Sequence, residues 1–350
     1  MNPLRLPKDL SSTEALGHLD RRASLLAQNV LHLVILPTEQ CNFRCTYCYE
    51  DFALGRMSEG VSQGIRRLLQ TRAPNLDRLT LSWFGGEPLA AYDRVEEIQG
   101  FAAHLGQSHP RLKLRGEITT NGYLLSQMRF EKLLSLGVKV FQISLDGPQE
   151  IHDQKRLRAD GSGTFQRIWS HLQAISEVTG DFEVILRLHV DRENHLAMRK
   201  LLRQIAATFG KEPRFRLFIR KLSRLGGAND AQLPVLVGID GEKIVRDLRS
   251  EAASLGLSLK EPEKGESICY ASATNSFVIR SNGAISKCTV ALTDSRNLLG
   301  RISQDGSLEI DADKLNGWAR GLLSGNSEEL RCPLQGLPQL ALARPVAMAT

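Results

Sequence analysis

Three cysteines near the start of the chain have the spacing of a metal-binding loop. Cys41, Cys45 and Cys48 are so close in sequence that one loop can aim all three thiolates at one point. Structural zinc sites usually have four protein ligands, commonly from two cysteine pairs. No fourth cysteine lies nearby, which favours an iron–sulfur cluster with one iron free of cysteine. Zinc and unligated buried cysteines are the two alternatives.

Three further cysteines, Cys269, Cys288 and Cys332, are spread over the last quarter of the chain. Residues 1–20 have no basic start followed by an apolar stretch, so we expect no secretory signal and a cytoplasmic protein. Without secretion, a disulfide framework is disfavoured. The cysteines therefore indicate one metal site and, with this second trio, a candidate second site.

Composition is that of a folded globular protein. The chain has 350 residues, of which 42% are hydrophobic and 24% charged. These values exclude disordered, collagen-like and small disulfide-stapled classes and suggest about two domains. No apolar run is long enough to span a membrane, so we expect no membrane association.

Positive charge is concentrated in one stretch of a chain whose net charge is +6. Residues 187–224 hold eleven Lys or Arg residues against three acids. This excess points to an acidic partner such as an acidic peptide, a phosphate or a nucleic acid. The alternative is a solvated helix face with charged strand ends.

Strand-like and helix-like segments alternate over the first two thirds of the chain. The predicted strands are 30–36, 78–84, 112–119, 138–145, 182–190 and 215–220. The predicted helices are 58–71, 95–105, 127–136, 165–178 and 195–209. This alternation implies parallel strands with helical crossovers, as in a barrel or a doubly wound sheet, and periodicity does not decide between the two.

The chemically interesting residues follow the predicted strands. Residues 41–48 follow the first strand, 85–88 the second, 120–122 the third and 146–147 the fourth. Because the carboxyl ends of parallel strands share one edge, we expect these residues to form a single site.

The pattern changes after residue 220. A glycine-rich loop at 226–230 is a candidate boundary, and a helix is predicted at 239–255. Asn282 and Gly283 then predict a hairpin turn between two short strands, with Cys269 before the hairpin and Cys288 at its end. The expected domains are an extension (1–29), an α/β domain (30–225), a smaller domain (226–335) and a tail (336–350).

Taken together, these motifs resemble those of the radical S-adenosylmethionine (SAM) enzymes. The cysteine triplet resembles the family signature, and 83–88 (Trp-Phe-Gly-Gly-Glu-Pro) resembles its GGEP motif. Residues 118–122 and 143–147 resemble its third-strand and fourth-strand motifs. The resemblance covers about residues 30–220 and is specific because the motifs occur in the family's order.

The resemblance implies an α/β fold, a partial (β/α)6 TIM-like barrel, with a [4Fe–4S] cluster on Cys41, Cys45 and Cys48. It implies that SAM binds the open iron and is cleaved reductively to methionine and a 5′-deoxyadenosyl radical, which takes a hydrogen atom from substrate. It assigns no catalytic side chain. The implied SAM-binding residues are Tyr47, Gly85, Gly86, Glu87, Pro88, Thr120, Asn121, Ser144, Asp146 and Arg187. On the same strand as Arg187, His189 is interpreted as a satisfied core histidine.

The C-terminal cysteines resemble the opening of the SPASM domain, which holds auxiliary clusters. Cys269, Gly283 and Cys288 match its start, and 297–302 resembles the segment that follows. Beyond that only Cys332 remains, so a complete two-cluster SPASM domain is excluded. Either the three cysteines hold one auxiliary cluster, as in the shorter twitch form of this small α+β domain, or they hold none.

The implied function is radical modification of a ribosomally made peptide, most simply a carbon–carbon or thioether crosslink. If both cysteine trios bind clusters, no thiol is left as a hydrogen donor, which argues against peptide epimerisation. The alternatives are a small-molecule substrate, a sulfatase-maturase-like protein target, or epimerisation. The expected partners are a precursor peptide with an acidic segment steered by the basic stretch, and a reductant such as flavodoxin or ferredoxin, rather than nucleic acid.

Overall fold

One ten-stranded sheet runs through the computed structural model, which describes residues 22–260 and 267–338. Its strand order is β10-β9-β8-β7-β1-β2-β3-β4-β5-β6. The strands are β1 (Val30–Ile35), β2 (Arg78–Trp83), β3 (Lys113–Thr120), β4 (Val138–Leu145), β5 (Glu183–Val190), β6 (Phe215–Lys221), β7 (Ser276–Ile279), β8 (Ala284–Ser286), β9 (Leu298–Ile302) and β10 (Leu308–Ile310). The expected N-terminal extension (1–29) and tail (336–350) lie mainly outside the described ranges, in residues 1–21 and 339–350.

Helices connect the strands. The α-helices are α2 (Glu59–Arg72), α3 (Tyr92–Ser108), α4 (Gln127–Ser135), α5 (Gln149–Lys155), α6 (Phe165–Ser176), α7 (His195–Phe209), α8 (Gly238–Ser254), α9 (Ala312–Ser324) and α10 (Ser327–Arg331). Short 3-10 turns are η1 (Ala73–Asn75), η2 (Pro88–Ala91), η3 (Asp230–Gln232), η4 (Tyr270–Ser272) and η5 (Ser295–Asn297). In the described parts of the chain, no helix is long and apolar enough to cross a membrane.

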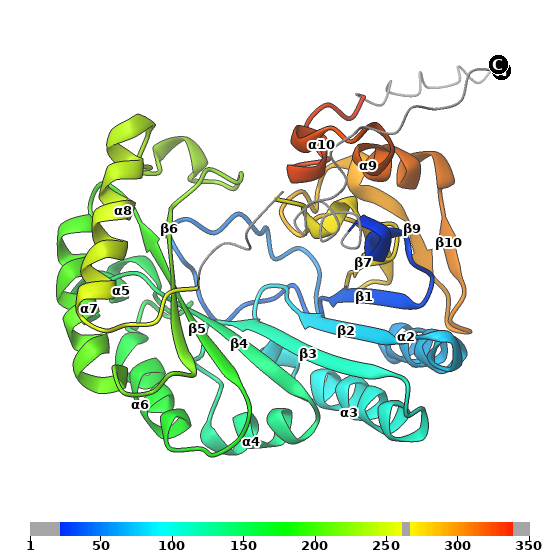
Figure 1. The fold of residues 1–350 in the computed structure, drawn as a ribbon, viewed down its shortest axis with the longest axis horizontal. Coiled ribbons are helices and arrows are strands. Elements are labelled where there is room, and N and C mark those ends of the chain that lie inside the picture. Colours follow the sequence, from blue (N-terminus) through cyan, green and yellow to red (C-terminus); the bar gives the residue numbers. More distant parts are fainter. Residues whose placement is uncertain (1–21, 261–266, 339–350) are drawn as a thin grey trace, which may run out of the picture.

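Strands β1 to β6 form a partial barrel. They pair in parallel and in chain order, and helices lie along the outer side of their curved sheet (Figure 1). A doubly wound sheet would reverse its strand order and carry helices on both faces. The partial (β/α)6 barrel is therefore confirmed, and the doubly wound sheet, which the sequence periodicity left open, is excluded.

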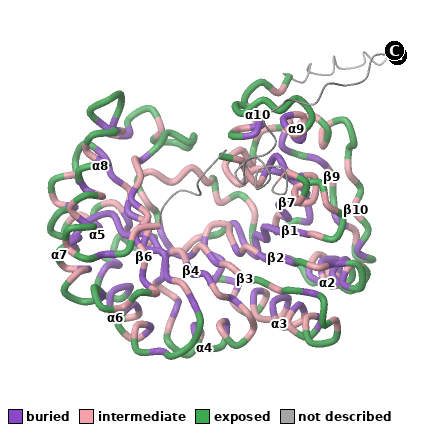
Figure 2. Tube along the Cα trace, in the orientation of Figure 1, coloured by how far each residue is buried: buried purple, intermediate pink, exposed green. Residues whose placement is uncertain are grey.

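Local sequence signals explain where the barrel helices begin and which faces they bury. The Ser58 side chain accepts from the Val61 amide at the start of α2, as its cap position predicts. Helix α6 buries Phe165, Ile168 and Leu172, which recur at helical spacing on one face. Buried positions accordingly follow the strands and the inward helix faces (Figure 2).

The C-terminal region extends the same sheet. Strand β7 pairs in parallel with β1, and β8, β9 and β10 continue as antiparallel neighbours. The predicted hairpin at Asn282 and Gly283 is present, with Gly283 at φ 83°. Helices α5, α9 and α10 and strands β9 and β10 were not predicted. All of them except α9 are short, whereas α9 carries Leu315, Trp318 and Ala319 at helical spacing, a signal that was missed.

A buried ion pair joins the C-terminal region to the loop that carries the first cysteines. Arg280, just after β7, donates to both carboxylate oxygens of Glu39 at 3.0 and 2.5 Å. The Glu39 side chain is only 3% exposed. Arg280 also donates to the Leu292 carbonyl, so it ties together three segments.

We predict that Glu39→Gln destabilises the chain by about 2 kcal/mol, because it leaves the half-buried Arg280 guanidinium without its carboxylate partner. Urea denaturation followed by tryptophan fluorescence measures the loss. The control is Glu59→Gln: Glu59 pairs with Arg66 but is 61% exposed, so its loss is expected to be under about 1 kcal/mol. Equal losses in the two variants would contradict the prediction.

Candidate active site

The first three cysteines lie in the loop directly after β1. Burial raises the pKa of Cys45 and raises that of Cys48 to about 11. Burial also raises the pKa of Cys41, as do the charge of Glu87 and those of the neighbouring thiols. The Phe43 amide donates to Cys41 Sγ at 3.3 Å. The three thiols thus share one half-buried environment in which thiolates need a positive partner.

In the described ranges, no group of three or more Cys, His, Asp or Glu side chains is drawn together as a single-ion site. A single zinc needs its ligands on one atom, whereas a cluster takes each thiolate on a different iron. The charges of Cys45 and Cys48 act on Cys41, so the loop offers three neighbouring thiols, a donor set that fits a cluster.

The two glycines after β2 pack against the backbone that leads into the cysteine loop. A Cβ on Gly85, whose φ is +119°, would lie 2.3 Å from the Thr38 carbonyl oxygen, and one on Gly86 would lie 2.5 Å from that of Gln40. The Glu87 amide donates to the same Gln40 carbonyl at 3.0 Å. The close approach that these glycines permit is therefore to the chain just before Cys41.

Glu87 is fully buried and joins the ends of two strands. Its carboxylate accepts from the Leu89 amide at 2.9 Å, from Thr120 Oγ1 at 2.7 Å and from the Asn121 amide at 2.7 Å. Burial raises its pKa, and these donors oppose that shift. With both oxygens engaged, Glu87 acts as a positioning residue beneath the pocket.

A second buried network lies beneath the carboxyl ends of β4 and β5. Asp146 accepts from Tyr47 Oη at 2.5 Å and lies 3.1 Å from His189 Nδ1. Arg156 Nη1 donates to Tyr47 Oη at 2.6 Å. Burial alone would raise the pKa of Asp146, but the hydrogen bond and charge of His189 and the charge of Arg156 hold it well below its usual range.

A pocket of about 430 Å³ opens over these networks and is shared by both parts of the sheet. The barrel residues that line it include the three cysteines, Tyr47, Gly85, Gly86, Thr120, Asn121, Ser144 and Arg187. Tyr270, Thr289 and Val290, which adjoin Cys269 and Cys288, form part of the same wall. Glu87, Pro88 and Asp146, also named by sequence analysis, lie behind the lining.

Sequence analysis missed several lining residues. Arg156 contacts the pocket, and so do Tyr49 and Glu50, directly after the triplet; Arg220, which sequence analysis counted only within the basic stretch, also lines it. Burial raises the pKa of Glu50 to about 8. Tyr49 and Glu50 could have been predicted from their position directly after the cysteine triplet. Arg156 could not, because it lies where a helix passes into a loop and belongs to no motif.

A glycine-rich loop covers the cysteine loop. A Cβ on Gly227 would lie 2.5 Å from the Cys48 carbonyl oxygen, and Asn229 Nδ2 donates to the Thr46 carbonyl at 2.9 Å. The segment read from sequence as a candidate boundary therefore packs on the cysteine loop.

The second cysteine trio is also brought together. Cys269 precedes η4, Cys288 follows β8, and Cys332 ends α10. Burial raises the pKa of Cys269, and the charges of Cys288 and Cys332 raise it further. The Cys269 amide donates to the Leu330 carbonyl at 2.8 Å, which fixes α10 against this segment.

Most of the basic stretch is neutralised by acids within the chain. Arg216 pairs with Glu183 at the amino end of β5, far from the pocket, and Lys221 pairs with Glu242. Arg214 pairs with Glu212 in the same way. The stretch is therefore not one continuous steering surface, and its pocket-facing members are Arg187, Arg220 and Lys221.

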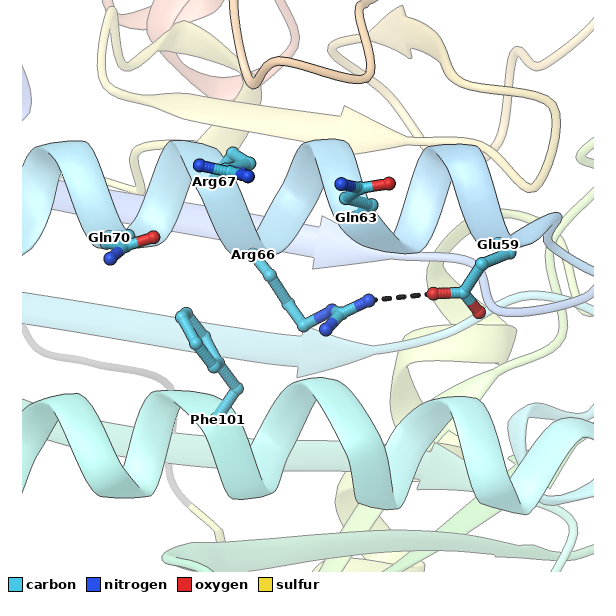
Figure 3. Close-up of a pocket in the computed structure, with 6 residues that line it drawn as sticks. All are labelled: Glu59, Gln63, Arg66, Arg67, Gln70 and Phe101. Atoms are coloured by element: carbon cyan, nitrogen blue, oxygen red, sulfur yellow. Dashed lines mark hydrogen bonds and ion pairs between the residues drawn. The ribbon is translucent and has the colours of Figure 1, made fainter.

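Another hollow lies on the outer surface between α2 and α3 (Figure 3). Its lining is Glu59, Gln63, Arg66, Arg67, Gln70 and Phe101, and Arg66 donates to Glu59 at 2.8 Å. It contains none of the cysteines or motif residues, so we place the candidate active site in the shared pocket.

Comparisons with known proteins give a family match for the part of the chain that carries the motifs. Residues 35–204 match the radical SAM superfamily. A cysteine-type anaerobic sulfatase-maturating enzyme of Clostridium novyi (strain NT) is 28% identical over 174 residues, which are 47% of this chain and 46% of the relative. The chain therefore spans about half the length of the curated relatives that it matches.

Two solved structures share the fold at low sequence identity. Native anSMEcpe with bound AdoMet and Kp18Cys peptide gives a TM-score of 0.61 at 20% identity, covering 82% of this chain and 80% of that one. SuiB of Streptococcus suis bound to its precursor peptide SuiA gives 0.60 at 14% identity, covering 91% and 74%.

We predict that His152 makes the chain less stable as the pH falls. Its Nδ1 accepts from the Asp146 amide, and burial lowers its pKa to about 4. Below about pH 6.5, His152 becomes protonated in the unfolded chain and stays neutral in the folded chain. The free energy of unfolding therefore falls as the pH decreases towards 4.

Between pH 8 and 5.5, the wild type should therefore lose about 1 kcal/mol more than His152→Gln, measured by urea denaturation at each pH. His104→Gln, at an exposed helix position, is the control and should lose as much as the wild type. If His152→Gln loses as much as the wild type, His152 does not cause the pH dependence.

Proposed function

We propose that the chain is a radical SAM enzyme that modifies a ribosomally made peptide, because residues 35–204 match the radical SAM superfamily. The observation that carries the proposal is the single pocket that unites Cys41, Cys45 and Cys48 with residues from the ends of β2, β3 and β4. When bound, a [4Fe–4S] cluster supplies the electron for reductive cleavage of SAM, which provides the radical that takes a hydrogen atom from substrate.

The proposed roles follow from the contacts of each residue. Cys41, Cys45 and Cys48 hold the cluster. Gly85, Gly86 and Ser144 line the space for SAM, and Thr120 and Asn121 join that wall while their bonds to Glu87 keep it in place. Tyr47 is held by Asp146 and Arg156, which fixes its ring at the pocket wall.

A peptide substrate is supported by the shape of the pocket and by the fold. The pocket extends from the barrel to Tyr270 and Thr289 of the C-terminal region, so a ligand there contacts both parts. The anSMEcpe and SuiB structures, which have this fold, were determined with peptides bound. The match to the sulfatase-maturating enzyme makes a protein target the second candidate.

We also propose that Cys269, Cys288 and Cys332 hold one auxiliary cluster. The charges of Cys288 and Cys332 act on Cys269, and the Val290 amide donates to Cys288 Sγ at 3.4 Å. With both trios occupied, no cysteine is free as a hydrogen donor, which favours a net oxidation such as a carbon–carbon or thioether crosslink over epimerisation. A flavodoxin or ferredoxin is the proposed reductant.

We predict that the anaerobically reconstituted wild type binds about eight irons per chain and that a Cys41/Cys45/Cys48→Ala variant binds about four. With dithionite, the wild type should form 5′-deoxyadenosine from SAM, and the variant should form none, as measured by mass spectrometry. Cys269→Ala is the matched control: it should lower the iron content and keep SAM cleavage.

Each outcome bears on a different part of the proposal. A wild type that does not cleave SAM contradicts the enzyme assignment. About four irons in the wild type and none in the triple variant would contradict the auxiliary cluster alone. A free cysteine would then be available, and epimerisation would become the favoured reaction.

A further inference from the structure

Two arginines face the pocket from neighbouring strands. Arg187 lies on β5 and Arg220 on β6, and both line the pocket. In the register of the parallel pair, Arg187 lies beside Phe218 and His189 beside Arg220. Alternate residues of a strand share a face, so both arginines project from the concave side of the sheet, as Ser144 does on β4.

Neither arginine has an anionic partner in the described ranges. Arg187 Nε is buried without an acceptor, and the recorded contact of Arg220 is with the ring of Phe218, 5.8 Å from its centroid. Asp146 acts electrostatically on Arg187, but its carboxylate is already engaged by Tyr47 and His189. No ion pair joins Glu50, which also lines the pocket, to either of them.

These two residues contrast with the basic residues around them. Arg214, Arg216 and Lys221 are each paired with a glutamate. Burial and the charge of Arg220 lower the pKa of Arg187 to about 10, and burial lowers that of Arg220. Two desolvated cations that repel each other are stabilised by an anion placed between them.

The position of Arg220 indicates which ligand supplies that anion. The lining residues that sequence analysis assigns to SAM lie on β3 to β5 or in the loops after β1 to β3, whereas Arg220 lies on β6, the last strand of the sheet order. Beside it, the pocket wall is formed by Ser223 and Leu225 of the loop after β6. This side of the pocket is thus left for the substrate.

We propose that Arg220, supported by Arg187, binds a carboxylate of the peptide substrate, supplied by an Asp or Glu side chain next to the residue that is modified. The inference rests on the proposed peptide-modifying function and specifies its substrate class. Arg220 is the anchor because its guanidinium can make two parallel hydrogen bonds to a carboxylate, and Arg187 adds attraction from the neighbouring strand.

The test selects binding peptides from a displayed library of random short peptides, using the full reconstituted chain with SAM. Wild type should enrich Asp and Glu over Asn and Gln at one position by about tenfold. Arg220→Gln should abolish that preference, and Arg220→Lys should keep part of it. Arg216→Gln, on the same strand but paired with Glu183 away from the pocket, is the control and should keep all of it.

SAM also carries a carboxylate, and equilibrium dialysis of SAM shows whether Arg220 binds that group or the carboxylate of the peptide. Unchanged SAM affinity in Arg220→Gln, together with loss of the acidic preference, supports the proposal. An unchanged acidic preference overturns it, and weakened SAM binding in the same variant would assign the anion to SAM. A wild type that cleaves SAM yet selects no peptides overturns this inference and the peptide substrate, while the radical SAM assignment stands.

Discussion

The site depends on a carboxylate whose hydrogen bonds all go to the protein's own loops. Glu87 is buried under the pocket, where it accepts hydrogen bonds from Leu89, Thr120 and Asn121. Its own amide bonds to the Gln40 carbonyl, one residue before Cys41. One residue, through its side chain and its backbone amide, thus sets the relative positions of the β2 loop, the end of β3 and the segment before the first cysteine. Gly85 and Gly86 serve the same junction, because any larger residue would push these segments apart.

The charges around the pocket fall into two groups with different physical tasks. Some charged groups are bonded to other protein groups and hold loops in place. They are Asp146, Arg156 and Glu39. Among the described residues, Arg187 and Arg220 have no carboxylate partner, and their charges are left for a ligand. A buried charge is destabilising unless it is paired with an opposite charge. An unpaired buried charge in a site whose other charges are bonded therefore marks the place where a ligand supplies the opposite charge.

The sequence predicted which motifs share one site, but it did not predict the contacts that their side chains make. Strand-end positions and the order of the motifs predicted that Cys41, Gly85, Thr120 and Ser144 share one site, because parallel strands end at a common edge. Periodicity could not reveal that Glu87 faces the protein, since direction within a loop depends on tertiary packing. Arg220 was visible only as one charge among eleven, and the acids that neutralise its neighbours come from distant segments such as Glu183 and Glu242.

The pairing of β7 with β1 has a consequence for the independence of the two parts. Without the C-terminal region, one edge of Val30–Ile35 would lose its neighbour, and the strand that leads into the cysteine loop would become a free edge. The change near residue 225 therefore does not divide the sheet: β7 still joins β1 in parallel, and the antiparallel connection begins only at the hairpin between β7 and β8. In evolutionary terms, the loops of the C-terminal region are freer to change than β7, which has to stay as the flank of the barrel.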